Sequence, residues 1–92
     1  MALSREMARH GLDIVGLTEV RIMDSRRYDV EDALLLHSGA TTLVQGVAFM
    51  LRNKAKRALK SWSPISPRLL TARLTHRHGH LSVVVAYAPT DD

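Results

Sequence analysis

The sequence predicts an α+β domain built mainly from antiparallel strands, with one or two short helices. Several apolar runs of strand length follow one another along the chain, and glycine, proline and polar residues separate them. Helical spacing of apolar residues occurs only near the start and in the middle of the chain. At 92 residues the chain has room for one domain at most.

Composition limits the classes of protein to which this chain can belong. Hydrophobic residues make up 46% and aromatic residues only 4%, which disfavours disorder and requires a core of aliphatic side chains. The absence of cysteine excludes disulfides, thiol catalysis and Cys-ligated zinc, and it favours an intracellular setting. No apolar run is long enough for a membrane span, so no membrane partner is expected. The net charge of +4 is compatible with a nucleic-acid partner and equally with an ordinary solvated surface.

The first third of the chain predicts a helix, a strand and a loop. A short helix is expected over residues 3–10, where apolar residues recur at helical spacing, and Gly11 is expected to end it. Residues 12–17 are a nearly continuous apolar run, which is typical of a strand buried on both faces. Residues 21–32 are polar, lack periodicity and are expected to form a loop.

The rest of the chain predicts two hairpins around a short helix. The expected strand pairs are residues 33–38 with 45–51 and residues 68–74 with 81–87. Between the hairpins, the Asn53 side chain is expected to cap a helical turn through residues 54–59. Pro64 and Pro67 then favour extended chain, because proline lacks an amide donor and restricts the residue before it.

Polar groups at strand ends are the candidates for chemistry. Glu19 follows a buried strand and can bind magnesium, which takes one or two carboxylates and keeps several waters; alternatively, it pairs with Arg21 at the surface. Tyr87 ends the longest apolar strand, where its hydroxyl can hydrogen-bond a phosphate oxygen or simply face water. Thr90 and Asp91 can add polar contacts to such a site or belong to a frayed terminus.

Three further sets of residues each allow a functional and a purely structural interpretation. His76, His78 and His80 alternate as ligands on one strand face would, but Gly79 interrupts them and no fourth zinc ligand is evident. Trp62 can stack on a base or anchor the packing between a helix and a strand. A cationic cluster can contact a phosphate backbone or form a solvated helix face, and it consists of Lys54, Lys56, Arg57 and Lys60.

Four segments occur in an order that is fairly specific in combination. They are Asp13–Arg21, Ser38-Gly39 followed by Gly46-Val47-Ala48, Trp62–Arg73 and Val84–Thr90. In these segments the chain resembles the endonuclease/exonuclease/phosphatase superfamily, and within it the retrotransposon-derived endonucleases of the craniofacial development protein type.

The resemblance implies a four-layered αββα sandwich that cleaves phosphodiester bonds with Mg²⁺ or Mn²⁺. It implies that Glu19 is a metal ligand and that Tyr87 is a catalytic residue whose hydroxyl lies near the scissile phosphate. The resemblance gives Thr90 and Asp91 as weak candidates for substrate binding. The assignment of Thr90 is weak because many relatives carry asparagine at that position. DNA is the implied partner, and the nucleus is the implied location of a functional protein.

The resemblance covers only the N-terminal half of such a domain. It implies that residues 1–92 are a single partial domain, lacking an asparagine-bearing first strand and the C-terminal half with its water-activating Asp and its His. We therefore expect a one-sheet sandwich whose exposed apolar face associates with the missing half or with itself.

The expected function is that of a fragment of a Mg²⁺-dependent DNA endonuclease domain from a non-LTR retroelement. Such a fragment nicks DNA by metal-assisted hydrolysis only as part of the complete domain and is expected to be inactive alone. The alternative is a noncatalytic remnant that binds nucleic acid or a partner protein.

Overall fold

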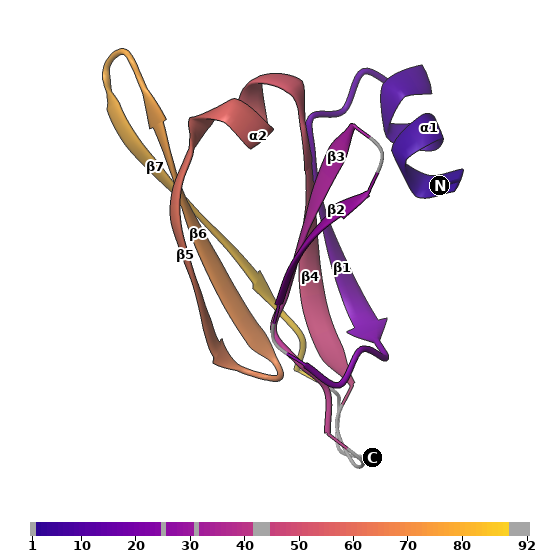
Figure 1. Cartoon of the computed structure of the whole chain (residues 1–92). Coiled ribbons are helices and arrows are strands. Elements are labelled where there is room, and N and C mark those ends of the chain that lie inside the picture. Colours follow the sequence, from indigo (N-terminus) through magenta and orange to yellow (C-terminus); the bar gives the residue numbers. More distant parts are fainter. Residues whose placement is uncertain (1, 25, 31, 42–44, 89–92) are drawn as a thin grey trace.

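Two antiparallel sheets and two short helices make up the computed structural model, which describes residues 2–24, 26–30, 32–41 and 45–88 (Figure 1). In chain order the elements are α1 (Ala2–Arg9), β1 (Ile14–Val20), β2 (Arg26–Val30), β3 (Ala33–His37), β4 (Gly46–Arg52), α2 (Asn53–Ala58), β5 (Leu59–Ser66), β6 (Leu69–His76) and β7 (Gly79–Ala86). The first sheet has the strand order β1-β4-β3-β2, and the second has the order β5-β6-β7. The predicted α+β class with mostly antiparallel strands and a couple of short helices is confirmed.

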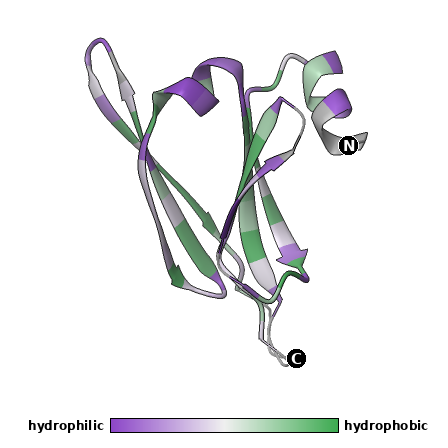
Figure 2. Ribbon diagram, in the orientation of Figure 1, coloured by the Kyte–Doolittle hydropathy of each residue, from purple (hydrophilic) through white to green (hydrophobic). Residues whose placement is uncertain are grey.

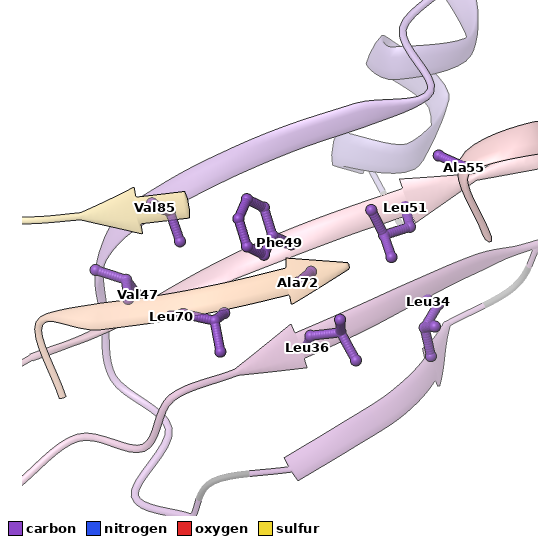
Figure 3. Packing of buried hydrophobic residues seen from close by; sticks show 9 residues of the cluster. All are labelled: Leu34, Leu36, Val47, Phe49, Leu51, Ala55, Leu70, Ala72 and Val85. Atoms are coloured by element: carbon purple, nitrogen blue, oxygen red, sulfur yellow. The ribbon is translucent and has the colours of Figure 1, made fainter. Parts of the chain in front are cut away.

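The expectation of a one-sheet sandwich is wrong, because a second sheet covers the apolar face of the first. The side chains buried between them form the inter-sheet cluster, which consists of Leu34, Leu36, Val47, Phe49, Leu51, Ala55, Leu70, Ala72 and Val85 (Figure 3). These residues come from both sheets and from α2. The apolar face that was expected to lie bare is therefore buried within this chain.

The β6–β7 hairpin of the second sheet was predicted, but its third strand was not, because β5 contains a proline. The segment around Pro64 was expected to be merely extended, yet it pairs with β6, with Trp62 opposite Ala72 and Ser63 opposite Thr71. Since β5 is an edge strand, a residue without an amide donor is tolerated there. The partly buried Trp62 packs against the inter-sheet cluster, as expected for an anchor.

The outer face of the first sheet is covered by α1. Met7 of α1 packs with four residues of β3 and β4, and together they form the α1 cluster of Met7, Ala33, Leu35, Ala48 and Met50. Because one face of β3 and β4 meets the second sheet and the other meets α1, every residue in these two strands is buried. Figure 2 shows hydrophobic residues along both strands. No helix in the described residues is long and apolar enough to cross a membrane.

The strand buried on both faces is therefore not the one that was predicted. The apolar run at residues 12–17 lies largely in β1, which is an edge strand and is only partly buried. Both predicted hairpins are confirmed: β3 pairs with β4 and β6 pairs with β7. An apolar run identifies a strand, but the strand order decides which runs become central.

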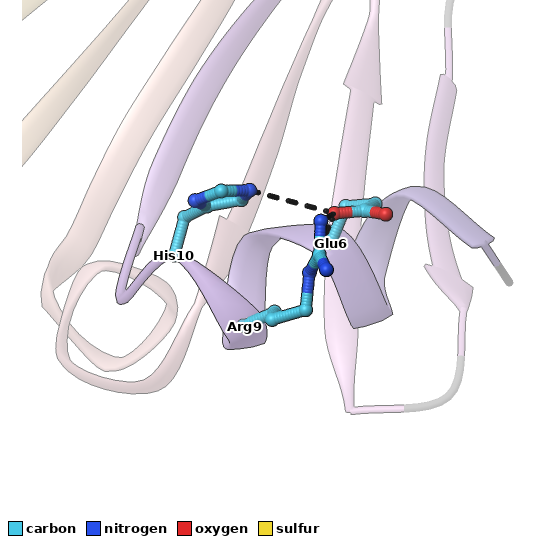
Figure 4. Close-up of polar contacts among 3 residues, drawn as sticks. All are labelled: Glu6, Arg9 and His10. Carbon is cyan, nitrogen blue, oxygen red and sulfur yellow. Dashed lines mark hydrogen bonds and ion pairs between the residues drawn. The ribbon is translucent and has the colours of Figure 1, made fainter.

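The N-terminal helix ends at Arg9, and Gly11 follows it in the predicted turn with a left-handed φ of 69°. Glu6 forms an ion pair with Arg9, with 3.0 Å between Oε2 and Nη2, and the same oxygen lies 3.6 Å from His10 Nε2 (Figure 4). All three side chains are exposed, so these contacts contribute little to stability.

Two local predictions are wrong. Residues 21–32 are not all loop, because β2 pairs antiparallel with β3 at the edge of the first sheet, where a polar strand is readily accommodated. Asn53 does not cap α2, because Arg52 occupies the N-cap position and makes no capping hydrogen bond through its side chain. Asn53 has a φ of 49°, and its Nδ2 donates to Asp13 Oδ1 at 3.4 Å.

An ion pair joins the end of β4 to the turn before β3. Arg52 is buried, and its Nη2 donates to Oδ2 of the exposed Asp32 at 2.8 Å. This hydrogen bond, together with the positive charge of Arg52, holds the pKa of Asp32 below its usual value. The pair therefore stabilises the fold only while Asp32 is ionised.

We expect Asp32→Asn to lower the melting temperature at about pH 7 but to have little effect at about pH 2. The folded-state pKa of Asp32 is depressed, so its stabilisation is present above the unfolded value of about 3.9 and is lost as the pH falls through the folded value. Thermal unfolding followed by circular dichroism across this range measures the difference. Asp24→Asn is the matched control, because Asp24 is exposed and its ion-pair partner among the described residues, Arg26, is exposed too. An equal effect of Asp32→Asn at both pH values would contradict the assignment.

Candidate functional site

Glu19 and Tyr87 meet at the seam between the two sheets, although 68 positions separate them in the sequence. The Tyr87 hydroxyl donates a hydrogen bond to Glu19 Oε1 at 2.9 Å. Glu19 belongs to β1 of the first sheet, and Tyr87 directly follows β7 of the second. The two side chains that the sequence singled out at strand ends are therefore in direct contact, although they come from different sheets.

A glycine lets β1 and β7 approach each other closely enough for this contact. A Cβ added to Gly16 would lie 3.3 Å from Val85 Cγ2, closer than an ordinary van der Waals contact. Val85 belongs to the inter-sheet cluster (Figure 3). Tyr87 lies two residues further along the chain, just after the end of β7. Because side chains alternate along extended chain, Tyr87 also faces β1. Its ring packs against the inter-sheet cluster.

A β-bulge turns Glu19 toward Tyr87. Leu17 is opposite Ala48 and Val20 is opposite Gly46, so β1 has one residue more than β4 between these two pairs. Leu17 and Val20 both pack against the α1 cluster although their odd spacing would place them on opposite faces of a regular strand. The extra residue therefore leaves Glu19 on the inter-sheet side.

The backbone of Glu19 is strained at this bulge. Its φ of 59° lies in the left-handed region, which residues other than glycine rarely adopt. Strain of this kind costs about 1–3 kcal/mol and persists only when the surrounding structure enforces it. Bulges of this type are common beside active sites, where they redirect a side chain. The local geometry thus favours a functional role for Glu19.

The environment of Tyr87 keeps its hydroxyl protonated. The hydrogen bond to Glu19 raises the pKa of Tyr87 above its ordinary value of 10.0, and the negative charge of Glu19 and desolvation act in the same direction. The positive charge of Arg68 acts in the opposite direction. Tyr87 is therefore a hydrogen-bond donor at neutral pH and is not suited to act as a base.

Two of the other candidate residues, Thr90 and Asp91, lie outside the described residues. Arg21, the alternative partner of Glu19, contacts the Gln45 side chain instead, with 2.8 Å from Nε and 3.1 Å from Nη2 to the amide oxygen in its hydrogen-bonding orientation. Among the described residues, no three His, Asp or Glu side chains are grouped to hold a metal ion.

Gly16 is the site residue that the sequence interpretation overlooked. It lies inside the apolar run of β1, where an isolated glycine usually marks a bulge or a close approach of another backbone. Here the close neighbour is the Val85 side chain of β7, and the bulge lies further along β1, between Leu17 and Val20. The signal was available in the sequence, but the identity of the approaching strand was not.

Comparison with known proteins gives one weak similarity. The chain is 25% identical over 89 residues to craniofacial development protein 2 of Bos taurus. The matched region covers 96% of this chain and 15% of that protein, so the chain spans only a small part of the relative's length. No protein-family profile matches the chain, and no solved structure matches it. A similarity at this level does not establish a family.

We expect Glu19→Gln to lower the pKa of Tyr87 toward about 10, because the substitution removes the negative charge that opposes ionisation of the phenol. Ultraviolet absorbance of the phenolate measures the titration. A Tyr28→Phe background leaves Tyr87 as the single tyrosine, and circular dichroism verifies that the protein is folded at each pH. Identical titrations with and without Glu19→Gln would show that the two side chains are not coupled in solution.

We expect Gly16→Val to destabilise the fold by about 1–3 kcal/mol, because a side chain here forces β1 away from β7. Urea denaturation measures the free energy of unfolding. In the Tyr28→Phe background, the same substitution should also lower the pKa of Tyr87 by separating it from Glu19. Ala86→Val is the control, since it adds a branched side chain at an exposed position of β7. The role assigned to Gly16 fails if Gly16→Val changes neither quantity.

Proposed function

We propose that this chain forms part of a Mg²⁺-dependent phosphodiesterase, and more specifically of a DNA endonuclease domain. In this proposal Glu19 holds the metal and Tyr87 hydrogen-bonds a substrate phosphate. The observation that carries it is the 2.9 Å contact between Tyr87 Oη and Glu19 Oε1 across the seam of the two sheets. Because the motif resemblance assigns these two residues to one catalytic site, their meeting in space supports that assignment.

The properties of Glu19 fit a magnesium ligand. The carboxylate is exposed, and one of its two oxygens accepts the hydrogen bond from Tyr87, which leaves acceptor capacity for a cation. Magnesium is commonly held by one or two carboxylates, with waters and substrate phosphates completing its coordination. When bound, the ion would supply Lewis-acid polarisation of the phosphate and offset its charge. This chemistry does not require a second carboxylate from the described residues.

Tyr87 suits the role of a phosphate ligand rather than that of a base. Its pKa is raised, so the hydroxyl keeps its proton and can donate to a phosphate oxygen. Its ring packs against the inter-sheet cluster, which limits the directions in which the hydroxyl can point. A side chain held in this way positions a substrate with little loss of conformational entropy on binding.

Hydrolysis needs more than these two groups. A group must activate the attacking water, and another must stabilise the charge that develops on the phosphate. The resemblance assigns these roles to segments that residues 1–92 do not contain. The proposal therefore places metal and phosphate binding in this chain and hydrolysis in a complete domain.

Manganese is a suitable probe of the proposed metal site, because its paramagnetism broadens the resonances of nearby nuclei. We expect titration with Mn²⁺ to broaden backbone amide resonances around Glu19 and Tyr87, and Glu19→Gln to abolish this broadening. Glu6→Gln is the matched control, since Glu6 is an exposed carboxylate on α1. Broadening that persists unchanged in Glu19→Gln would refute the assignment of the metal ligand.

Nicking of supercoiled plasmid tests the division of roles. We expect the 92-residue chain to produce no nicked plasmid with Mg²⁺ or Mn²⁺, because the water-activating group is assigned elsewhere. Metal-dependent nicking that Glu19→Ala abolishes would show instead that the chain is a complete enzyme. Salt-sensitive DNA binding that is indifferent to Mg²⁺ and to Glu19→Gln would favour the noncatalytic nucleic-acid-binding alternative.

A further inference from the structure

The turn between β5 and β6 is fixed to both sheets beside the Glu19–Tyr87 pair. Pro67 and Arg68 form a two-residue connection, and the residues on either side of it, Ser66 and Leu69, pair across the strands. The Ser38 hydroxyl of the first sheet's β3–β4 connection donates to the Pro67 carbonyl at 3.0 Å. The Arg68 amide donates to Ser66 Oγ at 3.2 Å. The backbone of Arg68 is therefore held on both sides.

Arg68 is the direct neighbour of Tyr87. The Tyr87 amide donates to the Arg68 carbonyl at 3.0 Å, which extends the β6–β7 ladder one residue beyond the pair of Leu69 and Ala86. The side chain of Arg68 is exposed, and no carboxylate of the described residues forms an ion pair with it. A cation without an acidic partner thus lies next to a phenol that is bound to a carboxylate.

We propose that the Arg68 guanidinium binds a phosphate group of the substrate beside the Glu19–Tyr87 pair. This inference rests on the proposed function, because it assigns the bound anion to the phosphodiester substrate. A phosphate that approaches Glu19 is repelled by the carboxylate, and a nearby cation offsets that repulsion. Arginine is suited to this role because its planar fork can donate two parallel hydrogen bonds to phosphate oxygens.

Each of the three side chains is suited to a different interaction with the substrate. Glu19 can accept a metal ion, the Tyr87 hydroxyl can donate one hydrogen bond, and Arg68 can donate two. The flanking hydrogen bonds fix the backbone of Arg68, so only the side chain has to be ordered when the anion binds. Arg68 was not singled out in the sequence, where it was expected to be the first residue of the strand at 68–74.

The test uses inorganic phosphate and a short DNA duplex as separate probes of the intact 92-residue chain. We expect both probes to shift the amide resonances of Arg68 and Tyr87, and Arg68→Gln to weaken the affinity for phosphate by about tenfold. Arg68→Lys should retain part of the affinity because it keeps the charge. The matched control is Arg73→Gln, because Arg73 is also exposed and has no carboxylate partner among the described residues.

Equal phosphate affinity in Arg68→Gln and the wild type would overturn the role of Arg68, and equal losses in Arg68→Gln and Arg73→Gln would overturn its specificity. Both results leave the metal assignment standing if Mn²⁺ broadening still depends on Glu19. The converse result is a phosphate affinity that depends on Arg68 together with Mn²⁺ broadening that persists in Glu19→Gln. That result refutes the proposed function but supports the anion site at Arg68. Melting temperatures of all variants separate lost binding from lost folding.

Discussion

The close approach of β1 and β7 is the constraint on which the candidate site depends. These strands lie at the edges of different sheets, so no hydrogen-bond ladder holds them together. What joins them is packing: Val85 lies against Gly16, and the inter-sheet cluster continues this contact through the interior. The hydrogen bond from Tyr87 to Glu19 forms where that packed seam reaches the surface. The geometry of the site is therefore set by how closely the sheets pack.

The sequence predicted which neighbouring strands pair, but it did not predict which strand lies in the centre of a sheet or which distant residues make contact. The hairpins of β3 with β4 and of β6 with β7 follow from adjacent apolar runs around short turns, and both were correct. Burial of a strand on both faces depends on its neighbours, so the apolar run at residues 12–17 was wrongly placed in the centre of a sheet. Local propensity likewise suggested a cap at Asn53, whereas its side chain contacts Asp13, 40 positions earlier.

The same distinction applies to the site. Glu19 and Tyr87 could be selected from their places at strand ends, but their contact could not be predicted. The contact requires an extra residue in β1, which turns the Glu19 side chain to the inter-sheet side. It also requires Gly16, which lets β7 pack closely against β1. Arg68 lies beside Tyr87 because β6 pairs with β7, and its place in the connection from β5 to β6 became visible only once β5 was found to be a strand. The site is a product of tertiary packing at each of these points.

The arrangement of the layers also indicates where the chain still has surface available for association. The first sheet carries α1 on its outer face, whereas in the described residues no helix lies over the outer face of the second sheet. Of the large apolar side chains exposed on β7, Val84 lies on the outer face, whereas Leu81 alternates with Val83 and Val85 on the inter-sheet side. Association with the missing half or with a second copy stays a prediction, but the apolar face on which it was expected is buried between the two sheets, so the fold removes the reason for expecting it.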